Sequence, residues 1–131
     1  MTEPQPLIAV HDVAASSRWY QGVLGCKCGH GGGEYEQLLD GARKMILQLH
    51  LWDREGDEHP HMGDPAKKPY GNGVPLWFQV DDFAAAVARV RALPAEILQG
   101  PMTNPNAKHR EIWLRDPDGY VVVLAGARGD V

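Results

Sequence analysis

The chain has 131 residues, of which 44% are hydrophobic, and a formal net charge of −4. This length and apolar fraction suit one domain with a core of its own. The mild acidity and the lack of a Lys/Arg stripe argue against nucleic-acid binding. No apolar run approaches the roughly 18 residues of a membrane-spanning helix, and the N-terminal stretch lacks a signal-peptide pattern. We therefore expect a cytoplasmic protein with neither a nucleic-acid nor a membrane partner.

The first half of the chain begins with an apolar run at residues 6–10, which predicts a strand. Asp12 then stands where a helix N-cap is expected, and Gly25 is a suitable C-terminal stop. Between them lies an apolar stripe at helical spacing, formed by Trp19, Tyr20, Val23 and Leu24. The pattern predicts a strand followed by a helix.

The cysteines come next, and both are in the segment "GCKCG" at residues 25–29. A disulfide between Cys26 and Cys28 would close almost no loop and would stabilise little. Neither a C-x-x-C motif nor a second cysteine pair is present, so two free thiols are favoured over a metal or redox role.

The second half repeats the pattern of the first. The run at residues 74–80 predicts a strand, Asp82 stands as the N-cap, and Pro94 ends the following helix. The apolar face of that helix comprises Phe83, Val87, Val90 and Leu93. Alternating runs then surround an Asp-Gly pair in each half, at residues 40–41 and 118–119, as is typical of hairpins.

The chain is thus predicted to be one domain spanning residues 1–131, built from two copies of strand-helix-strand-strand-strand. Module one spans about residues 4–53 and module two about residues 74–127. Between them, about residues 54–73 are polar and rich in Gly and Pro, which predicts a loop. The predicted fold class is α+β.

The repeated motifs resemble a known family. In the first half these are Val10, Asp12, Ser17, Trp19-Tyr20 and Leu24-Gly25; in the second, "VDDFAAAVARV" and "RDPDGY". In this order they resemble the glyoxalase/bleomycin-resistance/extradiol-dioxygenase superfamily, also called vicinal oxygen chelate proteins. The resemblance implies two βαβββ modules whose sheets curl around a cleft, usually in a homodimer.

The resemblance also implies four positions for the ligands of a divalent metal. Carried over to this chain, they are Gln5, Leu47, Pro75 and Val123. Three of the four lack a side-chain donor, whereas a catalytic metal generally needs about three protein ligands. We therefore expect no metal and no other cofactor, and favour a binding protein over an enzyme.

Strand periodicity predicts which residues line the cleft. Side chains at alternate positions face it, with the purely apolar face of each strand packed on the helix. In module two the predicted ligand-binding residues are Trp77, Gln79, Glu111, Trp113, Arg115, Val121 and Val123. In module one they are Leu47, which stands at a family metal-ligand position, and Leu49 on the same strand. Leu51 would also face the cleft, while Gln48 and His50 would point toward the helix.

Two function hypotheses follow. The favoured one is a metal-free protein that sequesters a planar organic compound, such as an antibiotic, because indole faces stack on flat groups. The alternative is a lyase or dioxygenase type of enzyme with a rearranged metal site, or with Glu111 as general acid/base. Other readings remain: Trp77 and Trp113 as core, Glu111 as a solvated strand residue, and His59 and His61 as solvated loop without a third metal ligand.

Overall fold

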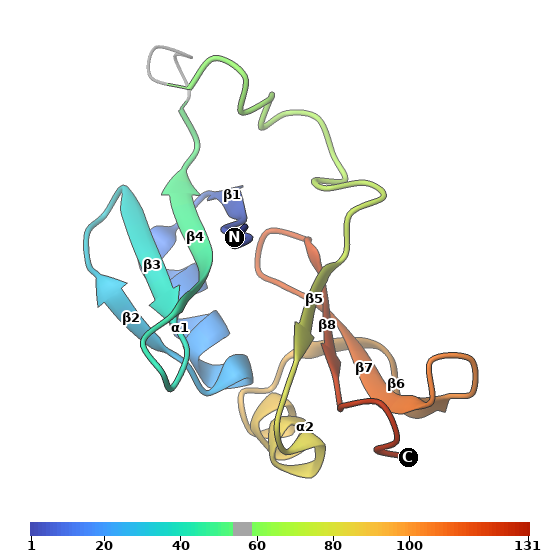
Figure 1. Ribbon diagram of the computed structural model, residues 1–131. Coiled ribbons are helices and arrows are strands. Elements are labelled where there is room, and N and C mark those ends of the chain that lie inside the picture. Colours follow the sequence, from blue (N-terminus) through green and yellow to red (C-terminus); the bar gives the residue numbers. More distant parts are fainter. Residues whose placement is uncertain (54–58) are drawn as a thin grey trace. The chain divides into compact units, whose positions relative to one another are not determined.

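The computed structural model describes residues 1–53 and 59–131 and contains the predicted order of elements twice (Figure 1). The chain divides into two compact units, described separately below. Unit 1 comprises residues 1–21 and 25–68, and unit 2 comprises residues 22–24 and 69–131. Residues 59–73 form turns without a strand or helix, so this part of the predicted linker is loop; residues 54–58 lie outside the described residues.

Unit 1 is a four-stranded sheet with strand order β1-β4-β3-β2. The strands are β1 (Leu7–Val10), β2 (Lys27–His30), β3 (Tyr35–Leu39) and β4 (Met45–Leu51). The helix is α1 (Val13–Leu24), of which residues 13–21 belong to unit 1. β1 runs parallel to β4, while β2 and β3 join by antiparallel pairing. The core side chains include Ile8, Val10, Val13, Tyr20, Leu38, Leu47 and Leu49, all buried.

Unit 2 repeats this topology with strand order β5-β8-β7-β6. Its elements are β5 (Leu76–Gln79), α2 (Phe83–Ala92), β6 (Glu96–Asn104), β7 (His109–Arg115) and β8 (Val121–Ala125). α2 packs on β7 and β8. The buried side chains between them include Phe83, Ala86, Val87, Val90, Ile112, Leu114, Val122 and Leu124.

Both helices begin at the predicted aspartates. The carboxylate of Asp12 accepts a hydrogen bond from the backbone N–H of Ala15 at 3.0 Å, and Asp82 does the same for Ala85 at 3.0 Å. Each satisfies one of the donors that a helix N-terminus leaves without an intrahelical partner. α1 ends at Gly25, whose φ of 68° is left-handed, as is usual at a helix C-terminus.

The two Asp-Gly turns form by different means. At the second, Gly119 has a φ of 98° and donates to the carbonyl of Asp116 at 3.0 Å, as turn chemistry predicts. At the first, the positive φ of 64° belongs to Arg43 rather than to Gly41. The carboxylate of Asp40 accepts from the backbone of Ala42 and Lys44, which closes a longer turn.

None of the helices in the described part of the chain is long and apolar enough to cross a membrane.

Candidate functional site

The face of the unit 2 sheet opposite α2 carries every site residue predicted for this half of the chain. Val123 on the central strand β8 pairs with Trp77 on one side and with Trp113 on the other. One step along, Gln79 and Glu111 both pair with Ala125. Paired residues on adjacent strands project to the same face of a sheet. The alternation predicted for β5, β7 and β8 is therefore confirmed.

The two tryptophans of this face contact each other across the central strand. Their ring centroids lie 5.9 Å apart in an edge-to-face arrangement, which aromatic pairs favour. Val123, between them in the register, has no exposed surface. Trp77 is 46% exposed, and its ring also lies 5.8 Å from that of His109. The core reading of Trp77 is therefore wrong, since half of this indole faces outward.

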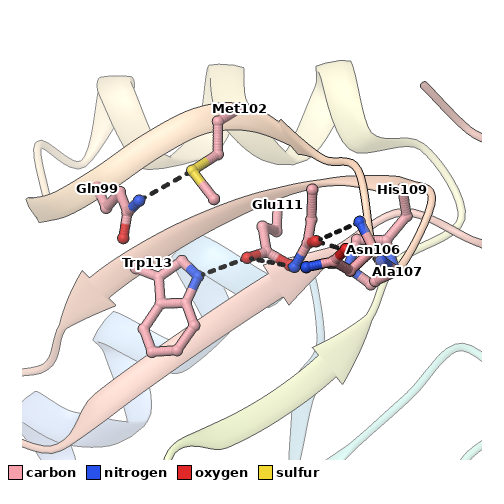
Figure 2. Close-up of polar contacts among 8 residues, drawn as sticks. Gln99, Met102, Asn106, Ala107, His109, Glu111 and Trp113 are labelled. Carbon is pink, nitrogen blue, oxygen red and sulfur yellow. Dashed lines mark hydrogen bonds and ion pairs between the residues drawn. The ribbon is translucent and has the colours of Figure 1, made fainter.

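Glu111 is the charged centre of the face (Figure 2). Its side chain is only 2% exposed, so the interpretation as a solvated strand residue is wrong. The carboxylate accepts hydrogen bonds from Trp113 Nε1 at 3.0 Å and from His109 Nε2 at 2.7 Å. Asn104 Nδ2 approaches the same carboxylate at 3.4 and 3.5 Å. We call Trp77, His109, Glu111 and Trp113 the aromatic face of unit 2.

The orientation of the Asn104 amide follows from its other contacts. Its Oδ1 accepts from the backbone N–H groups of Asn106 at 3.0 Å and of Ala107 at 3.2 Å. Because only the oxygen of an amide can accept, these two donors turn the NH₂ group toward Glu111. Three donors on three different side chains thus surround one buried carboxylate.

These donors decide the charge of Glu111. Burial alone raises the pKa of the Glu111 carboxyl, because it disfavours the ionised form. The hydrogen bonds from Trp113, His109 and Asn104 outweigh burial and leave the pKa below its usual value, and a protonated His109 would lower it further. Glu111 is therefore ionised at neutral pH, and its oxygens are already engaged by the protein.

The other predicted residues of unit 2 lie at the ends of this face. Arg115 donates to the carbonyl of Gly119 at 2.9 Å and pairs with Glu96 at 3.4 Å, so its guanidinium is tied to neighbouring elements. Gln79 is exposed and Val121 is half-buried. A cavity of about 340 Å³ lies on the α2 side of the unit, where Phe83 and Arg110 are among its walls, and it contains none of the predicted residues.

In unit 1 the predicted face of β4 is wrong. Leu47 and Leu49, expected to line a cleft, have no exposed surface. They alternate with Gln48 and His50, which are half-buried, and Leu51 shares the face of the leucines. The physical reason is that burying the leucine row stabilises the unit, whereas burying an amide and an imidazole would require partners for both.

The opposite face of unit 1 is lined by amides and rings. We call Tyr35, Gln37, Gln48 and His50 the polar face of unit 1; they share it because Tyr35 pairs with His50, and Gln37 with Gln48. The hydroxyl of Tyr35 donates to Gln48 Oε1, and Gln37 Nε2 donates to that hydroxyl at 3.1 Å. The Gln48 NH₂ group donates to the backbone carbonyl of Gln5 at 3.0 Å. The polar face is therefore internally hydrogen-bonded.

His50 also contacts the segment between the two predicted modules. Its Nδ1 lies 2.7 Å from the carbonyl of Leu51, which fixes the proton on Nδ1 because a carbonyl only accepts. Its Nε2 lies 3.1 Å from Nε2 of His59. His59 thus pairs with a histidine of β4, a contact that its spacing to His61 did not reveal. In the described residues no three His, Cys, Asp or Glu side chains gather as a metal site would require.

The four family positions do not fit a divalent metal. Pro75 and Val123 have no donor, and Val123 is covered as well. With Leu47 on the buried face, the neighbouring residue of β4 on the polar face is Gln48, whose oxygen already accepts from Tyr35. The amide oxygens of Gln5 and Gln48 alone fall short of the about three protein ligands that a catalytic metal generally needs.

Sequence reasoning missed two members of the Glu111 cluster. His109 stands two residues before Glu111 on the same strand, so period two could have placed it on the aromatic face. Asn104 gave no such signal, because it lies on the neighbouring strand β6, where its direct partner is His109 rather than Glu111.

This repeated topology defines a protein of the paired βαβββ-module class. A family model described as the Glyoxalase/Bleomycin resistance protein/Dioxygenase superfamily matches residues 4–124. The chain belongs to this superfamily, as its motifs predicted. No curated protein matches it.

Solved structures share the fold at low sequence identity. A virulence protein from Salmonella typhimurium is 21% identical, with a TM-score of 0.67 and 97% of each chain covered. The fosfomycin resistance protein FosX from Mesorhizobium loti is 17% identical, with a TM-score of 0.66, 96% of this chain and 92% of that one covered. A glyoxalase/dioxygenase from Nostoc punctiforme is 20% identical, with a TM-score of 0.68, 94% of this chain and 88% of that one covered.

Proposed function

We propose that the protein binds and sequesters a planar organic compound on the aromatic face of unit 2, with no metal at the family positions. The observation that carries this proposal is Trp77. Its indole is 46% exposed although Trp113 and His109 both contact it. Large aromatic side chains left outward in this way favour stacking with flat ligands.

The surroundings of Trp77 support a preorganised surface. Trp113 is fixed by its hydrogen bond to Glu111, and His109 by a second one. Neither ring can turn without breaking a bond to a buried ionised carboxylate, which is costly. A ligand that lies on Trp77 therefore loses little affinity to ordering of the protein.

The residues at the family positions favour binding over metal chemistry. They offer one amide, that of Gln5, and three side chains without donors, those of Leu47, Pro75 and Val123. A sequestering role needs only affinity, and relatives of the same fold include a fosfomycin resistance protein. Antibiotics with flat ring systems are therefore the first compounds to test.

The test is a screen of planar aromatic antibiotics and dyes by quenching of tryptophan fluorescence, followed by titration. Trp77→Ala should weaken the best binder about tenfold, which corresponds to about 1.4 kcal/mol. Trp77→Phe should retain most of the affinity because it keeps an aromatic face. Trp19→Phe, in α1, serves as the control for altered fluorescence.

An unchanged affinity in a folded Trp77→Ala variant would contradict the proposal. Elemental analysis of protein purified without chelator tests the second half of it. We expect no stoichiometric Fe, Ni, Zn or Mn at the family positions, whereas one such ion per chain that is lost in Gln5→Ala would contradict this.

A further inference from the structure

The imidazole of His109 is held in one tautomer. Its Nε2 lies 2.7 Å from Oε2 of Glu111, and the ionised carboxylate can only accept a hydrogen bond. The proton of a neutral His109 is therefore on Nε2, and its Nδ1 carries a lone pair. The same carboxylate accepts from Trp113 and Asn104, so it cannot turn away from the imidazole without leaving those donors unpaired.

Nδ1 of His109 has no hydrogen-bond partner among residues 1–53 and 59–131. It is also absent from the enclosed side-chain polar atoms that lack a partner in this part of the chain, among which is Arg110 Nε. The side chain of His109 retains 13% exposure. Nδ1 is therefore an acceptor that solvent, or a ligand in its place, can reach.

This acceptor lies next to the exposed indole. The rings of Trp77 and His109 are 5.8 Å apart and tilted by 54°, so substituents on a ring stacked over Trp77 come within reach of the imidazole. Protonation of Nδ1 would place an imidazolium against an ionised carboxylate, so that the new positive charge has a partner 2.7 Å away. A carboxylate that orients a histidine in this way is the arrangement found where histidine accepts protons.

We propose that His109 accepts the proton of a weakly acidic hydroxyl group, phenolic or enolic, on the planar ligand. The ligand's O–H bond breaks, an N–H bond forms at Nδ1, and the ligand is held as an oxyanion beside the imidazolium; no electron transfer or co-reactant is needed. This inference rests on the proposed ligand face and deepens it by naming the chemical class of the ligand. It also moves the proton-transfer role from Glu111, whose oxygens are engaged, to His109.

The test compares 7-hydroxycoumarin with 7-methoxycoumarin, which share a flat ring system and differ in the acidic hydroxyl. The hydroxy compound should bind at least about tenfold more tightly. Its bound form should show the phenolate absorption band at a pH at which the free compound is a phenol. His109→Phe keeps an aromatic ring beside Trp77 and should abolish both the band and the preference, whereas Trp77→Ala should weaken both coumarins alike.

The outcomes separate the two proposals. Equal binding of both coumarins without a phenolate band overturns the role of His109 but leaves the aromatic face as a ligand site. Binding of neither coumarin overturns the role of His109, and the panel of planar compounds then decides separately whether the face binds ligands. The phenolate band is read on the wild-type protein, so the test does not depend on the folding of His109→Phe, and His109→Gln provides a second variant.

Discussion

The two units share a topology and a helix-capping residue but use polar groups in opposite ways. The polar face of unit 1 spreads its hydrogen bonds over half-buried amides, a phenol and an imidazole. The aromatic face of unit 2 concentrates them on one enclosed carboxylate, Glu111. A half-buried amide can exchange a protein partner for water at small cost, whereas a buried charge cannot. The same topology therefore supports a tolerant polar surface in unit 1 and a rigid one in unit 2.

The largest expected effect tests which face of β4 is buried. Leu47→Ala should reduce the free energy of unfolding by about 2–5 kcal/mol, because it leaves a cavity in the core of unit 1. Gln48→Ala, one residue along, should cost about 1 kcal/mol or less, because water can replace its partners. Urea denaturation of both variants measures the difference. Equal losses, or a larger loss for Gln48→Ala, would show that the faces are assigned the wrong way round.

A second prediction compares two buried glutamates, one from each unit. Glu111→Gln should cost about 1.5–3 kcal/mol, since an NH₂ group then faces donors that bonded to a charged oxygen. Glu36, in unit 1, accepts the backbone N–H groups of His30 and Gln37 on the same Oε1, at 3.1 Å each. Glu36→Gln retains an oxygen that can accept both backbone N–H groups, and it should cost about 1 kcal/mol or less. Equal losses would show that the hydrogen bonds to Glu111 stabilise the fold no more than those to Glu36.

The pH dependence sharpens the same comparison. Because the pKa of Glu111 is lowered in the folded protein, its ionisation stabilises the fold above the unfolded value of about 4.5. That contribution is lost as the pH falls through the lower folded pKa. The gap in unfolding free energy between wild type and Glu111→Gln should therefore shrink as the pH falls below about 5. A gap that widens in acid would contradict the direction of the shift.

The smallest expected effect concerns what the units have in common. Asp12→Ala and Asp82→Ala each remove one N-cap hydrogen bond of 3.0 Å and should each cost about 1 kcal/mol. Asp→Ser at either position should restore most of the loss. Thermal unfolding of the four variants checks this. A cost confined to one helix would show that the two N-caps have the same geometry but contribute differently to stability.

Short-range patterns in the sequence predict much of this architecture. Asp12 and Asp82 mark helix starts because a capping side chain acts on residues three positions away, and the period of two in β5 and β7 separates Trp77 and Glu111 from the core. On β4 the alternation of leucines with Gln48 and His50 also indicated the correct face. The prediction failed there because the carried-over position of Leu47 was given more weight than periodicity.

The partners of Glu111 were harder to predict. His109 shares its strand and parity, but Asn104 reaches Glu111 from the neighbouring strand β6, where its direct partner is His109. The contact between His50 and His59 depends on the path of the linker, which no local pattern determines. Contacts between neighbouring strands and with long loops depend on the packing of the whole unit rather than on residues adjacent in the sequence.

The covering of Val123 bears on how this protein and its metal-binding relatives could interconvert. A glutamate placed there by one mutation would be forced under two indoles that touch each other, without donors reserved for its charge. It would unfold or distort unit 2 before it could coordinate an ion. Trp77 and Trp113 would have to shrink first, and with them the stacking surface would disappear. If the aromatic face binds ligands as proposed, stacking and metal coordination would therefore compete for the same part of the sheet.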